Sequence, residues 1–551
     1  MNGAGFTAPD IAWAQLTPVI LVLGAAVVGV LVEAFAPRRV RRTVQLTLSV
    51  AATAGALVAV ALLWSDVRTT GGTVVLGGAL VVDGPTLVLQ GTIALLALLS
   101  FLVVADRTRS GEDAFAPQAA ALPGSDYEEL ALRKGLAQTE VYPLLLFATG
   151  GMLIFPATAD LLTLFVALEV LSLPLYLLTG MARRRRLLSQ EASMKYFLLG
   201  AFASAILLFG VALLYGFSGS LRYSEIAAAT QTVVGLDGLL LVGAVLVLVG
   251  LLFKVGAVPF QQWTPDVYQG APTPVTGFMA ACTKVAAFGA LLRMMYVVLP
   301  GLAWDLEPML WAVAILTMVV GTVAALVQTD MKRMLAYSSI AHAGFVLTGV
   351  IALDSTGISS VLFYLLAYGA ATVGAFGIVS LVRERTAVPA TVTAGGGSDD
   401  VTESEGVVIG EATHLAQWAG LGRTHPLTAL TFTLFLLSFA GIPLTAGFTG
   451  KFAVFSAAVA GGAWQLALVG VLASAAAAFF YVRIVVLMFF TPPPGTEGAP
   501  DEAPSTSVTT VVTTQGFTAV AVAACALLTI VLGVLPSPVL DLVTEAAKFI
   551  P

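Results

Sequence analysis

Three lysines and one glutamate lie inside long apolar runs of this sequence, where an isolated charge is unfavourable. They are Glu169, Lys254, Lys284 and Lys451. Placing a lysine at the centre of a membrane helix costs about 2.5–3.5 kcal/mol on insertion scales. Burial disfavours the charged form of lysines and carboxylates, so such groups can exchange protons near neutral pH. Side chains of this kind could therefore pass protons through an apolar region.

Two of these lysines lie beside a proline. Pro259 follows Lys254 by five residues, and Pro443 precedes Lys451 by eight residues. Proline lacks a backbone donor and breaks a helix. Many transporters build ion sites at helix breaks near the middle of the bilayer. The recurrence predicts two broken helices, each with its own lysine.

A polar cluster in another apolar run could extend such a path. The segment DMKRMLAYSSIAHAG, residues 330–344, places Tyr337, Ser338, Ser339 and His342 close together. Hydroxyl and imidazole groups can order a chain of waters, and imidazole titrates near neutrality. A histidine in such a helix is equally often a packing residue, so both interpretations stay open.

The ionisable residues also have structural interpretations. Lys254 and Lys451 could extend to the membrane surface, and Lys195, near the end of its apolar run, could anchor that helix at the interface. Glu169 and Lys284 could make polar contacts between helices. Since isolated ionisable residues in membranes mark ion paths by default, a path for protons or cations is the favoured hypothesis.

The composition defines the class of protein that positions these residues. Of 551 residues, 58% are hydrophobic and only 11% are charged, against about 25% charged in soluble domains. The mean hydropathy is +0.95. Long uniform apolar runs differ from the alternating strands of a membrane barrel. The sequence predicts an all-α polytopic membrane protein in contact with the lipid bilayer.

Apolar windows of about 20 residues predict fourteen membrane spans. Spans seven and twelve are the broken ones, and the Gly-rich segment 71–84 is predicted to form a small hairpin outside the membrane. Two loops, 386–412 and 492–509, are predicted to be mobile rather than folded. The approximate limits of the spans are 13–35, 43–64, 85–105, 139–156, 158–180, 190–216, 236–260, 272–299, 306–328, 334–353, 357–382, 425–459, 463–491 and 515–540.

The spans are predicted to form a single membrane domain over residues 1–551 that contains an internal repeat. Three helices occupy residues 13–105, and a last helix occupies 515–540. The ranges 139–299 and 306–491 each hold five helices, of which the fourth is broken. Because five is odd, the second unit would enter the membrane from the opposite side. This is the inverted repeat seen in several transporters.

The basic residues predict the orientation of the chain in its membrane. With both termini outside, the inner loops hold seventeen lysines and arginines and the outer side holds three, as the positive-inside rule requires. The inner residues are Arg38, Arg39, Arg41, Arg42, Arg107, Arg109, Arg133, Lys134, Arg183, Arg184, Arg185, Arg186, Lys332, Arg333, Arg383, Arg385 and Arg423.

The sequence offers little for binding a cofactor. It has two cysteines and three histidines, without CxxC, HxxxH or HExxH spacing, so iron–sulfur and zinc sites are not expected. It also lacks the glycine-rich phosphate loops of nucleotide-binding proteins. We expect no nucleotide, flavin, haem or metal in this chain, and no nucleic-acid partner.

Three segments resemble the antiporter-like membrane subunits of bacterial NADH:quinone oxidoreductase, respiratory complex I, and subunit N among them. They read FKVGAVPFQQWTPDVYQGAPTPVTGF, KRMLAYSSIAHAG and FAGIPLTAGFTGKF. The part WTPDVYQGAPTPV is the most specific to subunit N. The resemblance covers roughly residues 85–490. It implies fourteen helices, two inverted five-helix repeats and a role in proton pumping, coupled to quinone reduction elsewhere in the complex.

The resemblance also implies roles for partners and residues. Flavin, iron–sulfur clusters and quinone would belong to other subunits, and neighbouring antiporter-like subunits would be partners. Glu169, Lys254, Lys284 and Lys451 match the family's working residues. Gln261 stands where the family often has a histidine, which puts a titrating role there in doubt.

The hypothesis for the mechanism has an ion pair at its start. Glu169 pairs with Lys254, and the proton of Lys254 then passes to Lys284, past His342 and on to Lys451 for release outside. One alternative is a subunit of a multi-subunit cation/proton antiporter. Another is a scaffold that fills the membrane arm without conducting.

Overall fold

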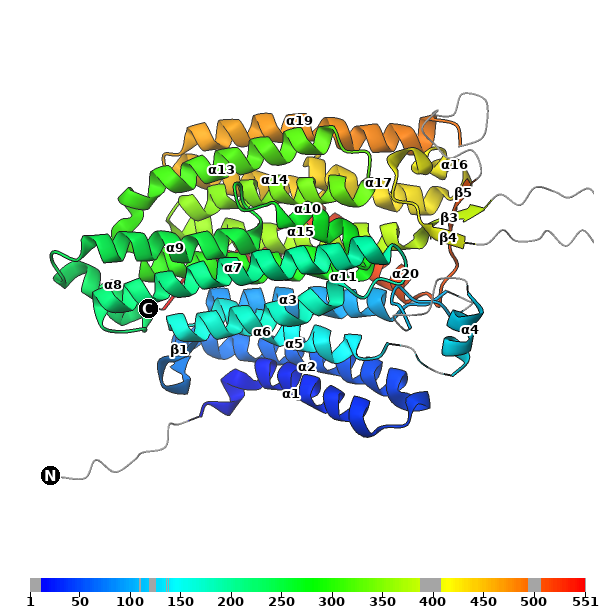
Figure 1. Ribbon diagram of the computed structural model, residues 1–551. Helices are drawn as coiled ribbons and strands as arrows, with labels where there is room; N and C mark the ends of the chain where they lie inside the picture. The colour runs from blue at the N-terminus through cyan, green and yellow to red at the C-terminus, as the bar shows by residue number, and fades with distance from the viewer. Residues whose placement is uncertain are drawn as a thin grey trace, which may run out of the picture.

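Long apolar helices that run side by side form the body of the molecule (Figure 1). The computed structural model describes residues 11–108, 111–117, 125–134, 136, 138–386, 408–493 and 507–550. In these ranges twelve helices are long and apolar enough to cross a membrane, and three shorter apolar helices accompany them. The predicted all-α polytopic class is confirmed. The count of fourteen spans stays a prediction.

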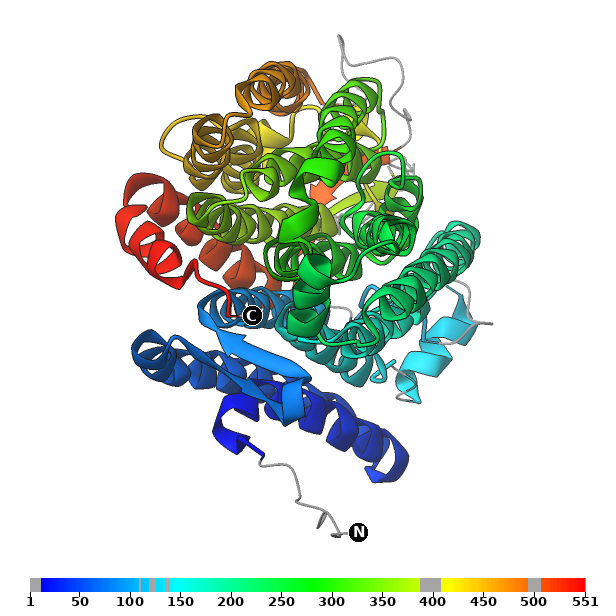
Figure 2. The ribbon, with the colours of Figure 1, turned by 90° about the vertical axis from the view of Figure 1, so that its left-hand side faces the viewer.

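The first half of the chain supplies the helices on one side of the bundle, and Figure 2 shows the N-terminal ones together at its edge. The principal helices are α1 (Trp13–Phe35), α2 (Arg38–Thr70), α3 (Gly84–Ala105), α5 (Val141–Ile154), α6 (Leu161–Thr179), α7 (Arg186–Ser218), α9 (Asp237–Val255), α10 (Trp263–Gly270), α11 (Thr273–Phe278) and α12 (Lys284–Arg293). Shorter helices, α4 (Asp126–Arg133) and α8 (Tyr223–Thr232), lie at the ends of the bundle.

The second half of the chain also consists mainly of long helices. Its elements are α13 (Ala303–Leu326), α14 (Met331–Ile351), α15 (Ser355–Leu381), α16 (Leu421–Thr424), α17 (Pro426–Ala440), α18 (Ala446–Ala460), α19 (Trp464–Phe490), α20 (Phe517–Val534) and α21 (Ser537–Ala546). The core lies around α12, α14 and α15, since nearly all of their apolar residues are buried. Helix α15 packs against α3, α11, α14, α17, α18 and α20.

The chain leaves the helical conformation at both predicted breaks. Helix α9 ends before Gly256, which has φ +76°, and α17 ends before Gly441, which has φ +81°. A left-handed residue after the last turn is the usual way to end a helix, and glycine adopts it without strain. Pro259 and Pro443 lie in the connections that follow. Glycine therefore ends each half-helix, and proline prevents the helix from resuming at once.

The helix that carries Lys284 is also irregular. A π-helical turn, Met279–Thr283, lies immediately before Lys284, and a second one, Met294–Val298, follows Arg293. π-Turns inside α-helices are rare and occur frequently at functional sites. The backbone around Lys284 is thus adapted locally, which hydropathy alone does not reveal.

Small sheets mark the two ends of the bundle (Figure 1). Strands β1 (Gly72–Val75) and β2 (Leu80–Asp83) form the predicted hairpin at what we call the hairpin end. At the opposite end, the sheet end, β3 (Val382–Thr386) pairs with both β4 (Val408–Glu411) and β5 (Ser507–Val511). The sequence did not predict this second sheet, whose strands flank the two loops expected to be mobile. The central parts of those loops lie outside the described residues.

A close helix contact at the second break yields a first testable prediction. A Cβ at Gly447 would overlap the backbone oxygen of Ser438, at the end of α17. We expect Gly447→Ala to lower the stability of the protein by about 1–3 kcal/mol, the usual cost of overpacking. The thermal unfolding of the purified membrane assembly measures this.

Gly24→Ala is the matched control, because no atom other than those of its own helix backbone lies within 4 Å of a Cβ at Gly24. It should leave the unfolding temperature unchanged or slightly raised. Equal stability of the two variants would show that the contact between α17 and α18 is looser than described.

Candidate functional site

Lys254 lies at the end of the first half-helix, α9, and is only 3% exposed. Its Nζ donates a hydrogen bond of 2.7 Å to Ser172 Oγ on α6. The ammonium group also lies 5.8 Å from the ring centroid of Tyr176 and 5.4 Å from that of Tyr196. Aromatic faces attract a cation, and more strongly where water is excluded. One hydroxyl group and two aromatic rings thus hold the Lys254 ammonium group in otherwise apolar surroundings.

The expected ion pair between Glu169 and Lys254 is not formed. Among the described residues no ion pair includes Glu169, and its buried Oε1 has no hydrogen-bond partner. Ser172, one turn further along α6, holds Lys254 instead. Glu169 lies on the same helix, α6, as the Ser172 that contacts Lys254. Two unit charges on nearby side chains interact appreciably in a medium of low dielectric constant. The two side chains thus form no ion pair in the described structure, and the electrostatic coupling of Glu169 to Lys254 stays a prediction.

Glu169 lies on the exposed stripe of α6. Leu162, Val166, Leu173 and Leu177 share this face, and each is about half exposed or more. Their spacing is that of one side of a helix. In a membrane this stripe meets either lipid or another protein, and an unpartnered carboxylate in lipid is costly.

Lys284 joins the first break to the polar cluster of α14. Its Nζ donates to the backbone oxygen of Val255 at 3.2 Å and to that of Ser339. Val255 is the last residue of α9, whose final carbonyls have no partner within the helix. A cation at the C-terminal end of a helix is also favoured by the helix dipole. Val255 directly follows Lys254 in the sequence, so Lys284 hydrogen-bonds to the residue next to Lys254.

Lys451 binds the second break in the same way. Its Nζ donates to the backbone oxygens of Phe439 at 2.7 Å and Ala440 at 3.1 Å, which are the last residues of α17, and to Ser474 Oγ at 2.7 Å. Its ammonium group lies 4.9 Å from the ring centroid of Phe345. Lys284 and Lys451 therefore make equivalent contacts, because each donates to backbone carbonyls at the C-terminal end of a half-helix.

A network of hydroxyl groups and one imidazole lies between these two lysines. His342 Nδ1 lies 2.7 Å from the Tyr364 hydroxyl, and Nε2 lies 3.3 Å from the Tyr481 hydroxyl. Tyr481 also hydrogen-bonds to Ser338. A cavity of about 10 Å³ adjoins His342 and Phe439, which is about the space that a single water needs. His342 is thus part of a polar network rather than an isolated packing residue.

Two of the weaker candidates lie apart from this network. Lys195 is 42% exposed in its side chain and forms ion pairs with Glu191 at 2.6 Å and Asp266 at 2.7 Å. Asp266 in turn pairs with Arg333 at 2.6 Å, so this group connects α10 to α7 and α14. No hydrogen bond of the described residues joins Tyr337 to the network. Lys195 thus belongs to a group of partly exposed ion pairs, and its role as an interfacial anchor stays a prediction.

Some of the polar partners could not be found from the sequence. Each of four side chains contacts a predicted residue from another helix: Ser172, Tyr364, Ser474 and Tyr481. Nothing in their local sequence separates them from other serines and tyrosines in apolar runs. Gln261, in the first break, has a buried Oε1 without a hydrogen-bond partner.

The class of protein follows from a comparison with known families. A sequence model described as NADH:quinone oxidoreductase/Mrp antiporter, transmembrane, matches residues 158–476. These residues include both breaks and all four predicted ionisable residues. The fold and the row of buried lysines thus define an antiporter-like membrane subunit.

Relatives of nearly full length refine this class. The chain is 66% identical over 552 residues to NADH-quinone oxidoreductase subunit N of Beutenbergia cavernae, covering 99% of both chains. It is 51% identical to subunit N of Mycobacterium tuberculosis, covering 98% of this chain and 99% of the other. The chain belongs to the subunit N family of NADH-quinone oxidoreductases.

Solved structures agree with this assignment. A chain of respiratory complex I from Thermus thermophilus with bound aureothin matches with a TM-score of 0.71 and 32% identity, covering 96% of this chain and 100% of that one. A chain of the Mrp complex from Dietzia matches with a TM-score of 0.76 and 23% identity, covering 98% and 97%. The second likeness concerns the fold alone.

Proposed function

We propose that this chain moves protons across a membrane as an antiporter-like subunit of NADH:quinone oxidoreductase, driven by quinone reduction in other subunits. One observation carries the proposal: three buried lysines, Lys254, Lys284 and Lys451, lie at two helix breaks, and a hydrogen-bonded network of hydroxyl groups and His342 lies near Lys284 and Lys451. Flavin, iron–sulfur clusters and quinone belong to other subunits in this proposal. Its partners are the neighbouring membrane subunits.

We further propose that the sheet end faces the cytoplasm of a bacterial cell and that both termini face outward. Arginines and lysines concentrate at the sheet end, as the positive-inside rule requires of a cytoplasmic face. The two predicted units, 139–299 and 306–491, each contain one of the half-helix sites. Their inverted relation would bring a site of each unit to the middle of the membrane.

The contacts suggest how a proton could travel. Ser172 positions Lys254, and a change of charge near Glu169 alters the free energy of the protonated lysine. The proton then passes across the first break to Lys284, through Ser338, Tyr481 and His342, and on to Lys451. Moving one charge against 100 mV costs about 2.3 kcal/mol. A buried charge interaction that is made and broken can supply this amount.

Glu169 is the point at which a neighbouring subunit could act. It is partly exposed on the apolar stripe of α6, and its buried oxygen lacks a partner. A partner that covers this stripe and brings or removes a positive charge would change the energy of Lys254 without touching it. In this way, redox chemistry in other subunits could change the protonation of Lys254.

Proton pumping in vesicles that contain the assembled complex tests the proposal. We expect Lys254→Ala and Glu169→Gln each to lower the number of protons pumped per NADH oxidised. The amount of assembled complex must be measured in the same vesicles. Full pumping by both variants in fully assembled complex would refute the proposed roles.

Ser172→Ala gives a milder and more specific test. The substitution removes the hydroxyl that accepts from Lys254, and we expect proton pumping to fall about two- to fivefold, equivalent to about 0.4–1 kcal/mol. This is less than the about 1.5–3 kcal/mol of a hydrogen bond to a charged group, because two aromatic rings still lie beside the ammonium group. Ser100→Ala is the matched control, because Ser100 is buried but its Oγ bonds only to Leu96 O within α3. An equal loss in both variants would point to a packing effect.

The alternative function is cation/proton antiport in a complex without NADH oxidation. The likeness to the Mrp complex keeps this open at the level of fold. Rescue of a salt-sensitive strain that lacks NADH dehydrogenase would favour it. The relatives of nearly full length favour the oxidoreductase.

A further inference from the structure

A pocket of about 100 Å³ lies at the hairpin end, apart from the row of lysines described above. Residues of the hairpin, of the start of α8 and of the end of α12 line it, as does Ile550. Among the described lining residues, two side chains, Arg222 and Arg293, are cationic and none is a carboxylate. The space holds several waters, and thus also a small ion such as phosphate.

Arg293 forms the buried wall of this pocket. Its Nε donates to the Pro156 backbone oxygen at 2.9 Å, and its Nη2 donates to Asp83 Oδ1 at 2.8 Å. Its Nη1 is buried and has no hydrogen-bond partner among the described residues. A guanidinium group carries five N–H donors in one plane, and a buried donor without an acceptor is unfavourable. The two N–H groups of Nη1 therefore need an acceptor, which an occupant of the pocket can supply.

The start of α8 adds a second cation and free amides to the pocket. Arg222 is the N-cap residue of this helix, and no side chain caps the helix. The first amides of a helix have no acceptor within it and carry partial positive charge, which favours a bound anion. Ser224, in the first turn, brings a hydroxyl group to the pocket lining. The N-terminus of α8 and the buried Arg293 therefore line the same pocket.

The other contacts of Arg222 leave it able to bind an anion. Its Nη2 donates to the Gly77 backbone oxygen at 3.1 Å, which ties the side chain to the hairpin. Its Nη1 lies 3.6 Å from Glu225 Oε1, and the two side chains are 56% and 53% exposed. Exposed pairs of this kind are weak, so a stronger acceptor can displace Glu225.

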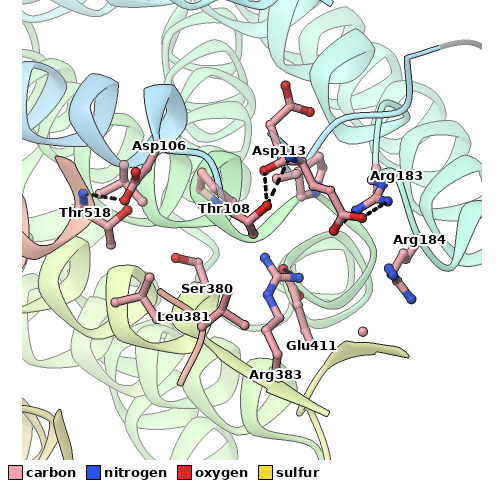
Figure 3. Close-up of a pocket in the computed structure, with 18 of the residues that line it drawn as sticks. Asp106, Thr108, Asp113, Arg183, Arg184, Ser380, Leu381, Arg383, Glu411 and Thr518 are labelled. Carbon is pink, nitrogen blue, oxygen red and sulfur yellow. Dashed lines mark hydrogen bonds and ion pairs between the residues drawn. The ribbon is translucent and has the colours of Figure 1, made fainter. Parts of the chain in front are cut away.

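A larger cavity, of about 370 Å³, lies at the sheet end and differs in its charge (Figure 3). Three of its basic side chains form ion pairs with carboxylates that also line it. The pairs are Arg107 with Asp113 at 2.9 Å, Arg183 with Glu112 at 2.7 Å, and Arg383 with Glu411 at 3.6 Å. Positive and negative groups thus offset one another there, whereas the described lining of the pocket at the hairpin end has cationic donors and no carboxylate.

We propose that the pocket at the hairpin end binds a phosphate group, held by Arg222, by Nη1 of Arg293 and by the first turn of α8. Arginine presents paired donors that match the oxygens of phosphate. The proposal goes beyond proton transport and does not rest on it. Two sources share this chemistry. One is the headgroup of a phospholipid, since headgroups lie at the ends of membrane-spanning helices, and the other is free inorganic phosphate.

Binding of radiolabelled inorganic phosphate tests the second source. The assembled complex is placed in nanodiscs of a glycolipid without phosphate, so that no headgroup competes. We expect Arg222→Gln to weaken phosphate binding about tenfold, equivalent to about 1.4 kcal/mol, because a charge-assisted hydrogen bond is lost. Arg68→Gln, which removes an exposed arginine at the same end of the bundle, is the matched control and should bind phosphate as the wild type does.

Native mass spectrometry of the complex tests the phospholipid source. The complex is reconstituted with phosphatidylglycerol and then released into detergent, and the retained lipids are counted. We expect the wild type and Arg68→Gln to retain a phospholipid molecule that Arg222→Gln loses. A difference in this measurement alone assigns the phosphate group to a headgroup, and a difference in phosphate binding alone assigns it to the free ion.

Glu225→Gln distinguishes a binding site from a loss of structure. The substitution removes the carboxylate that competes for Arg222, so we expect it to strengthen binding about twofold, since exposed pairs are weak. Weaker binding by Glu225→Gln would overturn the proposal, because it would show that changes at the start of α8 act through folding. Equal binding by Arg222→Gln and Arg68→Gln in both measurements would overturn it as well.

Discussion

Replacing Lys284 with methionine is expected to abolish proton transport through this subunit while the complex still assembles. Among the described residues, Lys284 is the only side chain that hydrogen-bonds both to the end of α9 and to the α14 backbone beside the polar network. Methionine fills similar space but carries no proton. We expect the transport attributable to this subunit to fall at least about tenfold, equivalent to about 1.4 kcal/mol in barrier height. Proton pumping per NADH oxidised, measured in vesicles, gives the result.

Two variants define what would count against this prediction. Lys284→Arg keeps a cation at the break but holds its proton too firmly to release it, so it should assemble well and pump poorly. Lys548→Met makes the same substitution at an exposed position near the C-terminus and should pump normally. A Lys284→Met complex that pumps fully would remove Lys284 from the path.

The largest loss of stability is expected on breaking the buried pair of Arg293 and Asp83. Both side chains are buried, at 1% and 0% exposed, and Arg293 Nη2 lies 2.8 Å from Asp83 Oδ1. Asp83 also caps α3 through Thr86 N, and Arg293 binds the Pro156 backbone oxygen. Removing one partner leaves an uncompensated buried charge, which costs about 3–5 kcal/mol.

Arg293→Met and Asp83→Asn should therefore each strongly lower the unfolding temperature of the assembly or the amount of protein in the membrane. The double variant should lose less than the sum of the two, because no lone charge remains. Arg68→Ala is the comparison, since its pair with Glu545 is 61% and 42% exposed and contributes about 1 kcal/mol or less. Additive losses in the double variant would contradict the coupling.

Hydropathy was sufficient to predict the class and most helices. The cost of exposing backbone and charge to lipid acts on every stretch of some 20 residues, so the spans can be recognised without knowing their neighbours. The same local rule located Lys254, Lys284 and Lys451, and all three are buried. A position at a helix break was predicted for Lys254 and Lys451, whereas only the structure shows that Lys284 contacts the end of α9. The hairpin near residue 71 was also predicted correctly from its glycines.

The hydrogen-bond partners of Lys254 and His342 could not be predicted, because they include side chains from helices far apart in the sequence. The carboxylate of Glu169 seemed the natural partner of Lys254, yet Ser172, one turn along, faces Lys254 and takes that place. Tyr481 reaches His342 from a helix about 140 residues away. Which of several serines or tyrosines makes such a contact depends on helix rotation and packing, which composition does not encode.

From the sequence alone it could be determined that this chain crosses a membrane many times and sequesters a few lysines there, because the free energy of placing each residue in lipid is a local property. The tertiary structure decided that two of those lysines hold the open ends of half-helices and that a serine takes the place of the expected counter-ion. These features arise where backbone groups left unpaired at a helix break must find donors from other helices, and only the packed fold brings those donors within reach.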